Sequence, residues 1–138
     1  MVNLVIVSHS RRLAEGVCEV ARQMADNQVR IIPVGGIRDQ NDGTAVEWLL
    51  GTNALEIASA IEDAMSDEGV LVLVDLGSAC IAAEEALEML PEWMQAQVLM
   101  SNAPLVEGAI VAAVEASMGR SLPDVNAAAE EACRTSKR

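Results

Sequence analysis

The chain has 138 residues, of which 51% are hydrophobic, and this is the size of one domain with a sizeable core. Its 21 acidic residues outnumber the nine basic ones and give a net charge of −12, which repels nucleic acid and anionic membranes, so we expect neither as a ligand. No apolar run approaches transmembrane length, and Met1 leads directly into an apolar run, so we expect no signal peptide. The three cysteines lack metal-type spacing, so we expect reduced thiols in a cytoplasmic protein.

Four short apolar runs predict strands at residues 2–7, 29–34, 70–74 and 97–100. Each run is continuous rather than alternating, which is typical of parallel strands that are covered on both faces. Helical patterns lie between the runs. The first is marked by Leu13, Val17, Val20 and Met24, and the second by Leu55, Ala58, Ile61 and Met65. The third covers residues 79–90, the fourth covers residues 104–118 with Asn102 as its candidate cap, and a weaker last helix covers residues 122–133.

Residues 35–51 interrupt this alternation after the second strand. Gly35-Gly36 and the polar run 39–43 have the composition of turns, and the short apolar piece 46–50 predicts one helical turn. Trp48 lies in this segment as either a local anchor or a contact for a partner, with a slight preference for the anchor.

The alternation of strands and helices predicts an α/β fold. We expect a doubly wound, mainly parallel sheet of about four strands flanked by helices, with right-handed crossovers. No internal repeat or long linker divides the chain, so residues 1–138 are expected to form a single domain. Within it, residues from about 122 to 138 are the C-terminal helix and a tail that frays after about residue 132.

The single histidine, His9, follows the first strand directly, where α/β sheets bind their ligands. A neutral imidazole there is a nucleophile that can carry a phosphoryl group. If the first and third strands are neighbours, Asp75 reaches this ring, fixes its tautomer and aims the other nitrogen outward. Gly77 and Ser78, at the start of the next helix, offer N–H groups and a hydroxyl to phosphate oxygens.

Each of these residues also has a plainer interpretation. His9 can be a surface or capping residue, Asp75 an ordinary helix cap, and the glycines turn formers. Cys80 lies at the same end but is more simply a small buried residue than a reactive thiolate. The sequence lacks the glycine-rich motifs of P-loop ATPases and dinucleotide sites, and a lone histidine makes a zinc site improbable. A two-component receiver domain would need acids where Ser8-His9-Ser10 stands.

Five motifs in order give the chain a family resemblance. They are Val7-Ser8-His9-Ser10, Gly35-Gly36, Gly51-Thr52, Asp75-Leu76-Gly77-Ser78-Ala79 and Ala103-Pro104-Leu105-Val106-Glu107-Gly108, and the likeness extends to about Met118. Together they resemble the mannose-type IIA family of the bacterial phosphotransferase system. Within it they resemble the phosphoryl-donor branch that serves phosphoenolpyruvate-dependent dihydroxyacetone kinase.

The resemblance implies a phosphoryl relay that needs no cofactor and no metal. His9 would be phosphorylated on its outer nitrogen by the histidine-phosphocarrier protein HPr, while Asp75 orients the ring through the other nitrogen. The group would then pass to ADP on a partner kinase subunit, and family members are homodimers. The expected support for the phosphate comes from Ser10, Gly35, Gly36, Gly51, Thr52, Gly77 and Ser78.

The sequence departs from the family pattern in two places. The first bears on which branch of the family the chain resembles, and the second lies in the loop between Gly36 and Gly51. The sugar-transport branch usually reads Asp-x-Gly-Gly-[Ser/Thr]-Pro after the third strand, whereas residues 75–79 hold one glycine and no proline. The segment between Gly36 and Gly51 is longer than usual for the kinase branch, and Gly43-Thr44 competes with the preferred Gly51-Thr52. The alternatives that stay open are a IIA component of a mannose-type sugar transporter and a regulatory module that binds partners according to its phosphorylation state.

Overall fold

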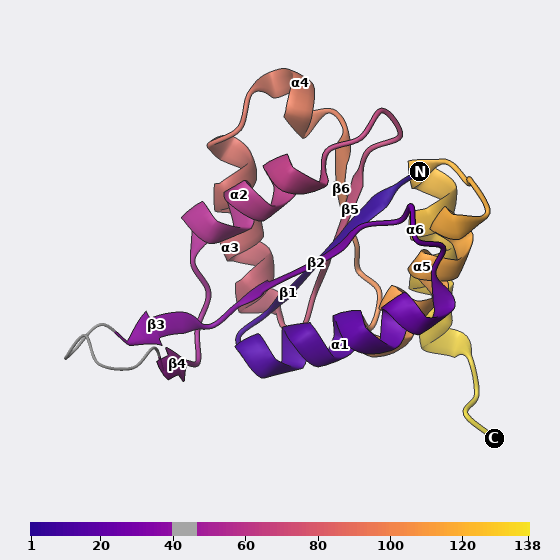
Figure 1. Cartoon of the computed structure of the whole chain (residues 1–138), viewed down its shortest axis with the longest axis horizontal. Helices are drawn as coiled ribbons and strands as arrows, with labels where there is room; N and C mark the ends of the chain where they lie inside the picture. The colour runs from indigo at the N-terminus through magenta and orange to yellow at the C-terminus, as the bar shows by residue number, and fades with distance from the viewer. Residues whose placement is uncertain (40–46) are drawn as a thin grey trace.

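The computed structural model describes residues 1–39 and 47–138. Its main sheet has four strands in the order β2-β1-β5-β6, all parallel to their neighbours (Figure 1). The strands are β1 (Asn3–Ser8), β2 (Ile31–Gly35), β5 (Val70–Val74) and β6 (Val98–Met100). The predicted α/β fold with a mainly parallel, four-stranded sheet is therefore confirmed.

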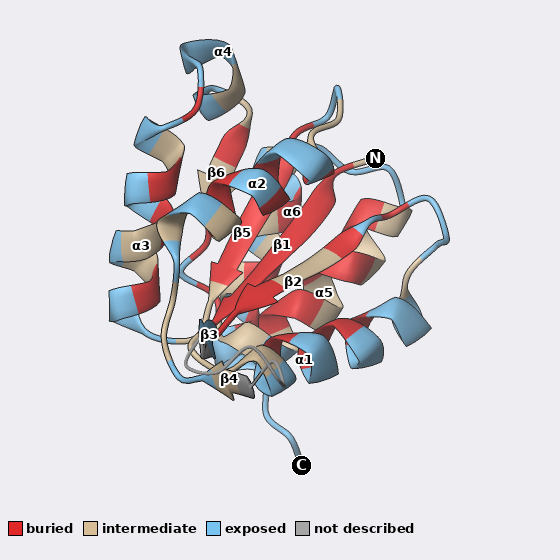
Figure 2. Ribbon diagram, turned by 60° about the vertical axis from the view of Figure 1, so that its left-hand side comes forward, coloured by how far each residue is buried: buried red, intermediate tan, exposed pale blue. Residues whose placement is uncertain are grey.

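Helices cover both faces of the sheet (Figures 1 and 2). One face carries α1 (Arg11–Met24), α5 (Leu105–Ser117) and α6 (Leu122–Glu131), and a short 3-10 turn, η1 (Ala132–Arg134), follows α6. The other face carries α2 (Ala54–Ala64) and α3 (Gly77–Glu88), with the one-turn helix α4 (Glu92–Gln95) after them. Side-chain caps from Ser10, Asn53 and Ser121 start α1, α2 and α6.

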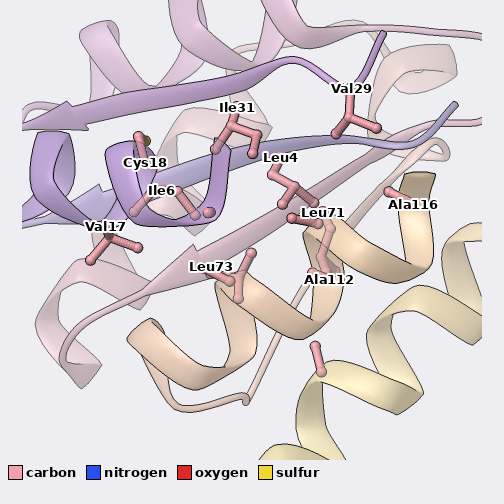
Figure 3. Packing of buried hydrophobic residues seen from close by; sticks show 14 of the residues in the cluster. Leu4, Ile6, Val17, Cys18, Val29, Ile31, Leu71, Leu73, Ala112 and Ala116 are labelled. Atoms are coloured by element: carbon pink, nitrogen blue, oxygen red, sulfur yellow. The ribbon is translucent and has the colours of Figure 1, made fainter. Parts of the chain in front are cut away.

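The strands are mainly apolar because successive side chains enter two different cores. Leu4 and Ile6 of β1 face α1 and α5, whereas Val5 and Val7 face α2 and α3. Figure 3 shows the first of these cores, in which the small side chains of α5 lie against the leucines of β5. No helix in residues 1–39 or 47–138 has the length and apolar character needed to cross a bilayer.

The helix marked by Leu13, Val17, Val20 and Met24 is confirmed as α1, but most of these side chains do not face the sheet. Leu13, Val20 and Met24 are exposed, and the buried side comprises Ala14, Val17, Cys18 and Ala21. The helix carries two apolar stripes, and a helical period alone does not say which one faces the sheet. Packing against β1 and β2 selects the smaller side chains, which let the helix approach closely. On α2, Leu55 is likewise exposed while Ala58 and Ile61 are buried.

The single helical turn predicted at residues 46–50 is also wrong. The segment forms β4 (Glu47–Leu49), which pairs antiparallel with β3 (Ile37–Asp39) in a separate two-stranded sheet. Pairing with β3 gives its backbone groups partners, which overrides a weak local helical preference in so short a piece. Residues 40–46, including the Gly43-Thr44 pair and most of the predicted turn run, lie outside the described part of the chain.

Asn102 does not cap the fourth helix, contrary to prediction. Pro104 occupies the N-cap position of α5, and the Asn102 N–H donates to the Glu130 carboxylate of α6 at 2.8 Å. The contact of Asn102 with α6 thus fixes the path of the chain before α5, and no pattern within residues 101–105 predicts it.

Candidate functional site

His9 and Asp75 meet at the carboxyl edge of the sheet. β1 and β5 are neighbours in register, with Val7 opposite Val74, so the residues that follow each strand come together. Nδ1 of His9 lies 3.0 Å from Oδ1 of Asp75. This contact was expected if the first and third predicted strands are neighbours. The role of Asp75 in orienting His9 for phosphoryl transfer stays a prediction.

The Asp75 carboxylate accepts three hydrogen bonds and is almost enclosed. Oδ2 accepts from the Ser8 hydroxyl at 2.9 Å and from the His9 backbone N–H at 3.0 Å, and Oδ1 faces the His9 ring. Burial opposes ionisation, but the hydrogen bonds from His9 and Ser8 outweigh it and hold the pKa of Asp75 below its ordinary value. The carboxylate is therefore ionised near neutral pH and serves only as an acceptor.

This carboxylate determines which ring nitrogen of His9 carries the proton. Because Asp75 can only accept, Nδ1 holds the hydrogen in the neutral ring and Nε2 holds the lone pair. Nε2 lies 2.7 Å from Oγ of Ser78, so the serine hydroxyl donates to it. The imidazole is thus held from both sides with its nucleophilic nitrogen directed at the first turn of α3.

The first turn of α3 adds donors and space beside Nε2. The helix begins at Gly77 without a side-chain cap. The N–H groups of Ala79 and Cys80 are bonded to the Leu76 carbonyl, which leaves the N–H groups of Gly77 and Ser78 as the donors of this turn. A Cβ built on Gly77 would meet nothing within 4 Å, so this turn borders open space. A helix start of this kind attracts an anion through its N–H groups and partial positive charge.

Ser8 is the site residue that the sequence analysis did not select. It is fully buried at the end of β1, donates to Asp75 and accepts from the Ser10 N–H at 3.0 Å. Two signals in the sequence could have found it: its hydroxyl ends the apolar run immediately before the histidine, and it lies within the motif Val7-Ser8-His9-Ser10. Cys80 bonds Glu84 on its own helix, and burial with that carboxylate raises the pKa of its thiol, which disfavours a reactive thiolate.

The other predicted support residues shape the backbone around His9. Ser10 caps α1 by accepting from the Leu13 N–H at 3.2 Å. The Gly51 N–H donates to the His9 carbonyl at 2.8 Å, and Gly51 has a φ of 149°, in a region that favours glycine. Thr52 follows it, half-buried, just before the cap of α2. The Ser10 hydroxyl and the Gly51 N–H thus bond to backbone groups of the segment around His9, so these two residues hold the loop that carries the ring.

Gly35 and Gly36 allow a close approach of backbone to backbone. Gly35 pairs with Ser8 across β1 and β2, and a Cβ there would collide with the Ser8 carbonyl oxygen. Gly36 has a φ of 74°, and a Cβ there would press on Arg11 and Trp48 at 3.2 Å each. These contacts favour a structural role in bringing β2 against the His9 segment.

Gly35→Ala is expected to destabilise the fold by about 1–3 kcal/mol, because the added methyl group must push β2 away from Ser8. Gly16→Ala is the matched control, since its Cβ would enter open space on the exposed side of α1 and a helical alanine gains about 0.5–1 kcal/mol. Urea unfolding of both variants measures the difference. Equal stability of the two would contradict the packing role of Gly35.

Trp48 anchors the β3–β4 hairpin beside the start of α1. The Arg11 guanidinium lies 4.6 Å from the centroid of the indole, and the Arg38 guanidinium lies 5.3 Å from it. Both distances are within the range of cation–π contacts. Of the two interpretations of Trp48, these contacts favour the local anchor.

The site contains no evident metal ligands. In the described ranges, no group of three or more His, Cys, Asp or Glu side chains lies close enough to hold a metal ion. The chemistry that the arrangement can perform is nucleophilic attack by Nε2, with Asp75 behind the ring and donors of α3 in front of it.

Comparisons with known proteins identify the family of the chain. Residues 3–126 match the family model EIIA-man, described as the fructose IIA component of the phosphotransferase system. The chain is similar to the phosphoryl donor subunit DhaM of a PEP-dependent dihydroxyacetone kinase from Escherichia coli K12, with 44% identity over 91% of the chain and 25% of that protein. It is 40% identical to the DhaM subunit of kinase 2 from Listeria innocua, over 83% of the chain and 86% of that protein.

A solved structure has the same fold. The crystal structure of a protein of unknown function superposes with a TM-score of 0.78 at 34% identity, covering 94% of this chain and 93% of that one. The chain spans about a quarter of the length of the Escherichia coli relative but most of the Listeria one. The chain therefore belongs to the EIIA-man family and, within it, to the DhaM phosphoryl-donor subunits.

Proposed function

We propose that this chain is a phosphoryl carrier that cycles between His9 and phospho-His9. It accepts the group from phosphorylated HPr and passes it to ADP on the ADP-binding subunit of a dihydroxyacetone kinase. The observation that carries the proposal is the 3.0 Å contact between Nδ1 of His9 and Asp75, which leaves Nε2 as the nucleophile. The names of the relatives, phosphoryl donor subunits of dihydroxyacetone kinases, support the proposed acceptor.

The proposed chemistry balances without a cofactor. The Nε2 lone pair attacks the phosphorus of phospho-HPr, so a new N–P bond forms while the N–P bond to the donor histidine breaks. Nδ1 keeps its proton, and the positive charge that develops on the ring is stabilised by Asp75. In the second step a terminal phosphate oxygen of ADP attacks, and the electrons of the Nε2–P bond return to the ring.

The oxygens of the phosphoryl group on His9 need hydrogen-bond donors from this chain. When Nε2 takes the phosphoryl group, the Ser78 hydroxyl turns its hydrogen from Nε2 to a phosphoryl oxygen, and the N–H groups at the start of α3 add partial positive charge. Such donors matter in a chain whose net charge is already −12.

The second candidate is a IIA component of a sugar transporter. The description of the matching family model, a fructose IIA component, favours it. The two candidates differ in the acceptor, since a transporter IIA component passes its phosphoryl group to a IIB domain.

Partner choice distinguishes them. The chain is labelled with radioactive phosphate from phosphoenolpyruvate, enzyme I and HPr, then isolated and divided between the ADP-loaded kinase subunit and a IIB domain. We expect labelled ATP in the first mixture, and none when ADP is omitted. Transfer to the IIB domain alone would overturn the kinase assignment.

We also infer a homodimer, as the family resemblance implies. The outer side of α1 exposes Leu13, Val20 and Met24, an apolar surface of the kind that a second copy covers. Sedimentation equilibrium is expected to give twice the chain mass of 14.6 kDa, and a single-chain mass at micromolar concentration would contradict the dimer.

A further inference from the structure

Ser8 links the start of α1 to the Asp75 carboxylate. Its Oγ accepts the Ser10 N–H at 3.0 Å, and its hydroxyl hydrogen is donated to Oδ2 of Asp75 at 2.9 Å. The side chain is fully buried, so water does not substitute for either partner. The direction of both bonds is settled, because a backbone N–H can only donate and an ionised carboxylate can only accept.

We propose that Ser8 is a positioning residue of the phosphoryl transfer, which holds Asp75 in the orientation that keeps the proton of His9 on Nδ1. The proposal rests on the proposed function for its effect on rate, but its structural content, the tautomer of His9, is independent of that function.

The geometry gives a reason for this role. The terminal torsion of an aspartate is broad, so a carboxylate is oriented by its hydrogen bonds rather than by its own rotamer preference. Oδ2 is held by Ser8 and by the His9 N–H, and this places Oδ1 at Nδ1. Without the hydroxyl, one bond fewer holds the carboxylate, which can turn away from the ring.

Once the carboxylate turns, the other tautomer of His9 becomes accessible. A proton on Nε2 can be donated to Oγ of Ser78, which lies 2.7 Å away. That tautomer has no lone pair on Nε2 and is not a nucleophile towards phosphorus at this nitrogen. The lowered pKa of Asp75, to which the Ser8 bond contributes, agrees with this account.

Ser101 is a matched control within the same molecule. It follows the end of β6 as Ser8 closes β1, it is buried, and its Oγ accepts the N–H two residues ahead, from Ala103, at 3.1 Å. Ser8→Ala and Ser101→Ala therefore remove the same type of buried turn bond. Only the first also removes a bond to Asp75.

The test is the tautomer of His9, read from nitrogen-15 NMR of unphosphorylated protein at pH 8.5, where histidines are ordinarily neutral. His9 is the single histidine, so its ring signals need no further assignment. We expect the wild type and Ser101→Ala to carry the proton on Nδ1, and Ser8→Ala to show a substantial population with the proton on Nε2. An unchanged tautomer in Ser8→Ala, or an equal change in Ser101→Ala, would overturn the proposal.

The second measurement is the rate at which phospho-HPr phosphorylates each variant. We expect Ser8→Ala to be about tenfold slower than Ser101→Ala, the factor that corresponds to one lost hydrogen bond to a charged group. If Ser8→Ala does not fold, Ser8→Cys gives the same comparison, since it is similar in size and its S–H is a weak donor. A wild type that accepts no phosphate would refute the proposed function, while the tautomer comparison would still decide the role of Ser8.

Discussion

His9→Ala is expected to abolish the incorporation of acid-labile phosphate, with a loss of more than roughly 10³-fold. The substitution removes the nucleophilic Nε2, and the chain has no other histidine to replace it. The measurement is intact mass, before and after mild acid, of the chain incubated with phosphoenolpyruvate, enzyme I and HPr. We expect one added phosphoryl group on the wild type, removed by acid, and none on the variant.

His9→Asn separates the nucleophile from the hydrogen bond. An asparagine amide can still donate to Asp75 but offers no basic nitrogen to phosphorus. We expect it to be as inactive as His9→Ala, and acid-labile phosphate on either variant would remove His9 from the relay.

His9→Asp tests the regulatory alternative, because it mimics the negative charge of the phosphorylated state but cannot turn over. If this variant supported partner signalling, the regulatory alternative would be favoured instead.

Asp75→Asn is expected to slow phosphoryl transfer by roughly 10²- to 10⁴-fold while leaving the protein folded. The amide carries no negative charge to stabilise the ring, and its NH₂ group can face Nδ1 and favour the wrong tautomer. Rapid-quench rates with phospho-HPr measure the effect, and far-ultraviolet circular dichroism checks the fold. Wild-type rates would exclude Asp75 from the mechanism.

The same variant gives a pH dependence of stability with a definite sign. Although burial opposes it, hydrogen bonding from His9 and Ser8 lowers the pKa of Asp75 in the folded state from its ordinary 3.8. A lowered pKa stabilises the folded state above pH 3.8, and this contribution is lost as the pH falls through the folded value. Urea unfolding at pH 6 and pH 3 is therefore expected to show wild type losing its advantage over Asp75→Asn at the lower pH. A difference that does not change with pH would contradict the lowered pKa.

The main sheet and the meeting of His9 with Asp75 could be predicted from the sequence. Continuous apolar runs are sufficient to identify buried parallel strands, because both faces of such strands require apolar side chains. The residues directly after the strands then share one edge of the sheet, whatever the details of the helices. Once β1 and β5 are neighbours, the position of Asp75 beside His9 follows from two strand ends.

Other features depend on contacts between segments that are distant in the sequence. The helical pattern did not show which face α1 buries, since Leu13 and Val20 fit a helical stripe as well as Ala14 and Val17 do. Only packing on the sheet distinguishes them. The β3–β4 hairpin was missed for a similar reason, because Trp48 gains its strand conformation from pairing with β3 and its contacts from Arg11 and Arg38.

The site itself shows most clearly which features the sequence predicts and which depend on tertiary packing. Continuous apolar runs and chain order were enough to place a histidine, a carboxylate and a helix start at one edge of the sheet, since these positions depend on backbone topology. The role of Ser8 depends on which oxygen of Asp75 its hydroxyl meets, and that of Gly35 on the close contact with the Ser8 carbonyl. Such contacts are set to within a few tenths of an ångström by the packing of the whole domain, so the tertiary structure alone decides them.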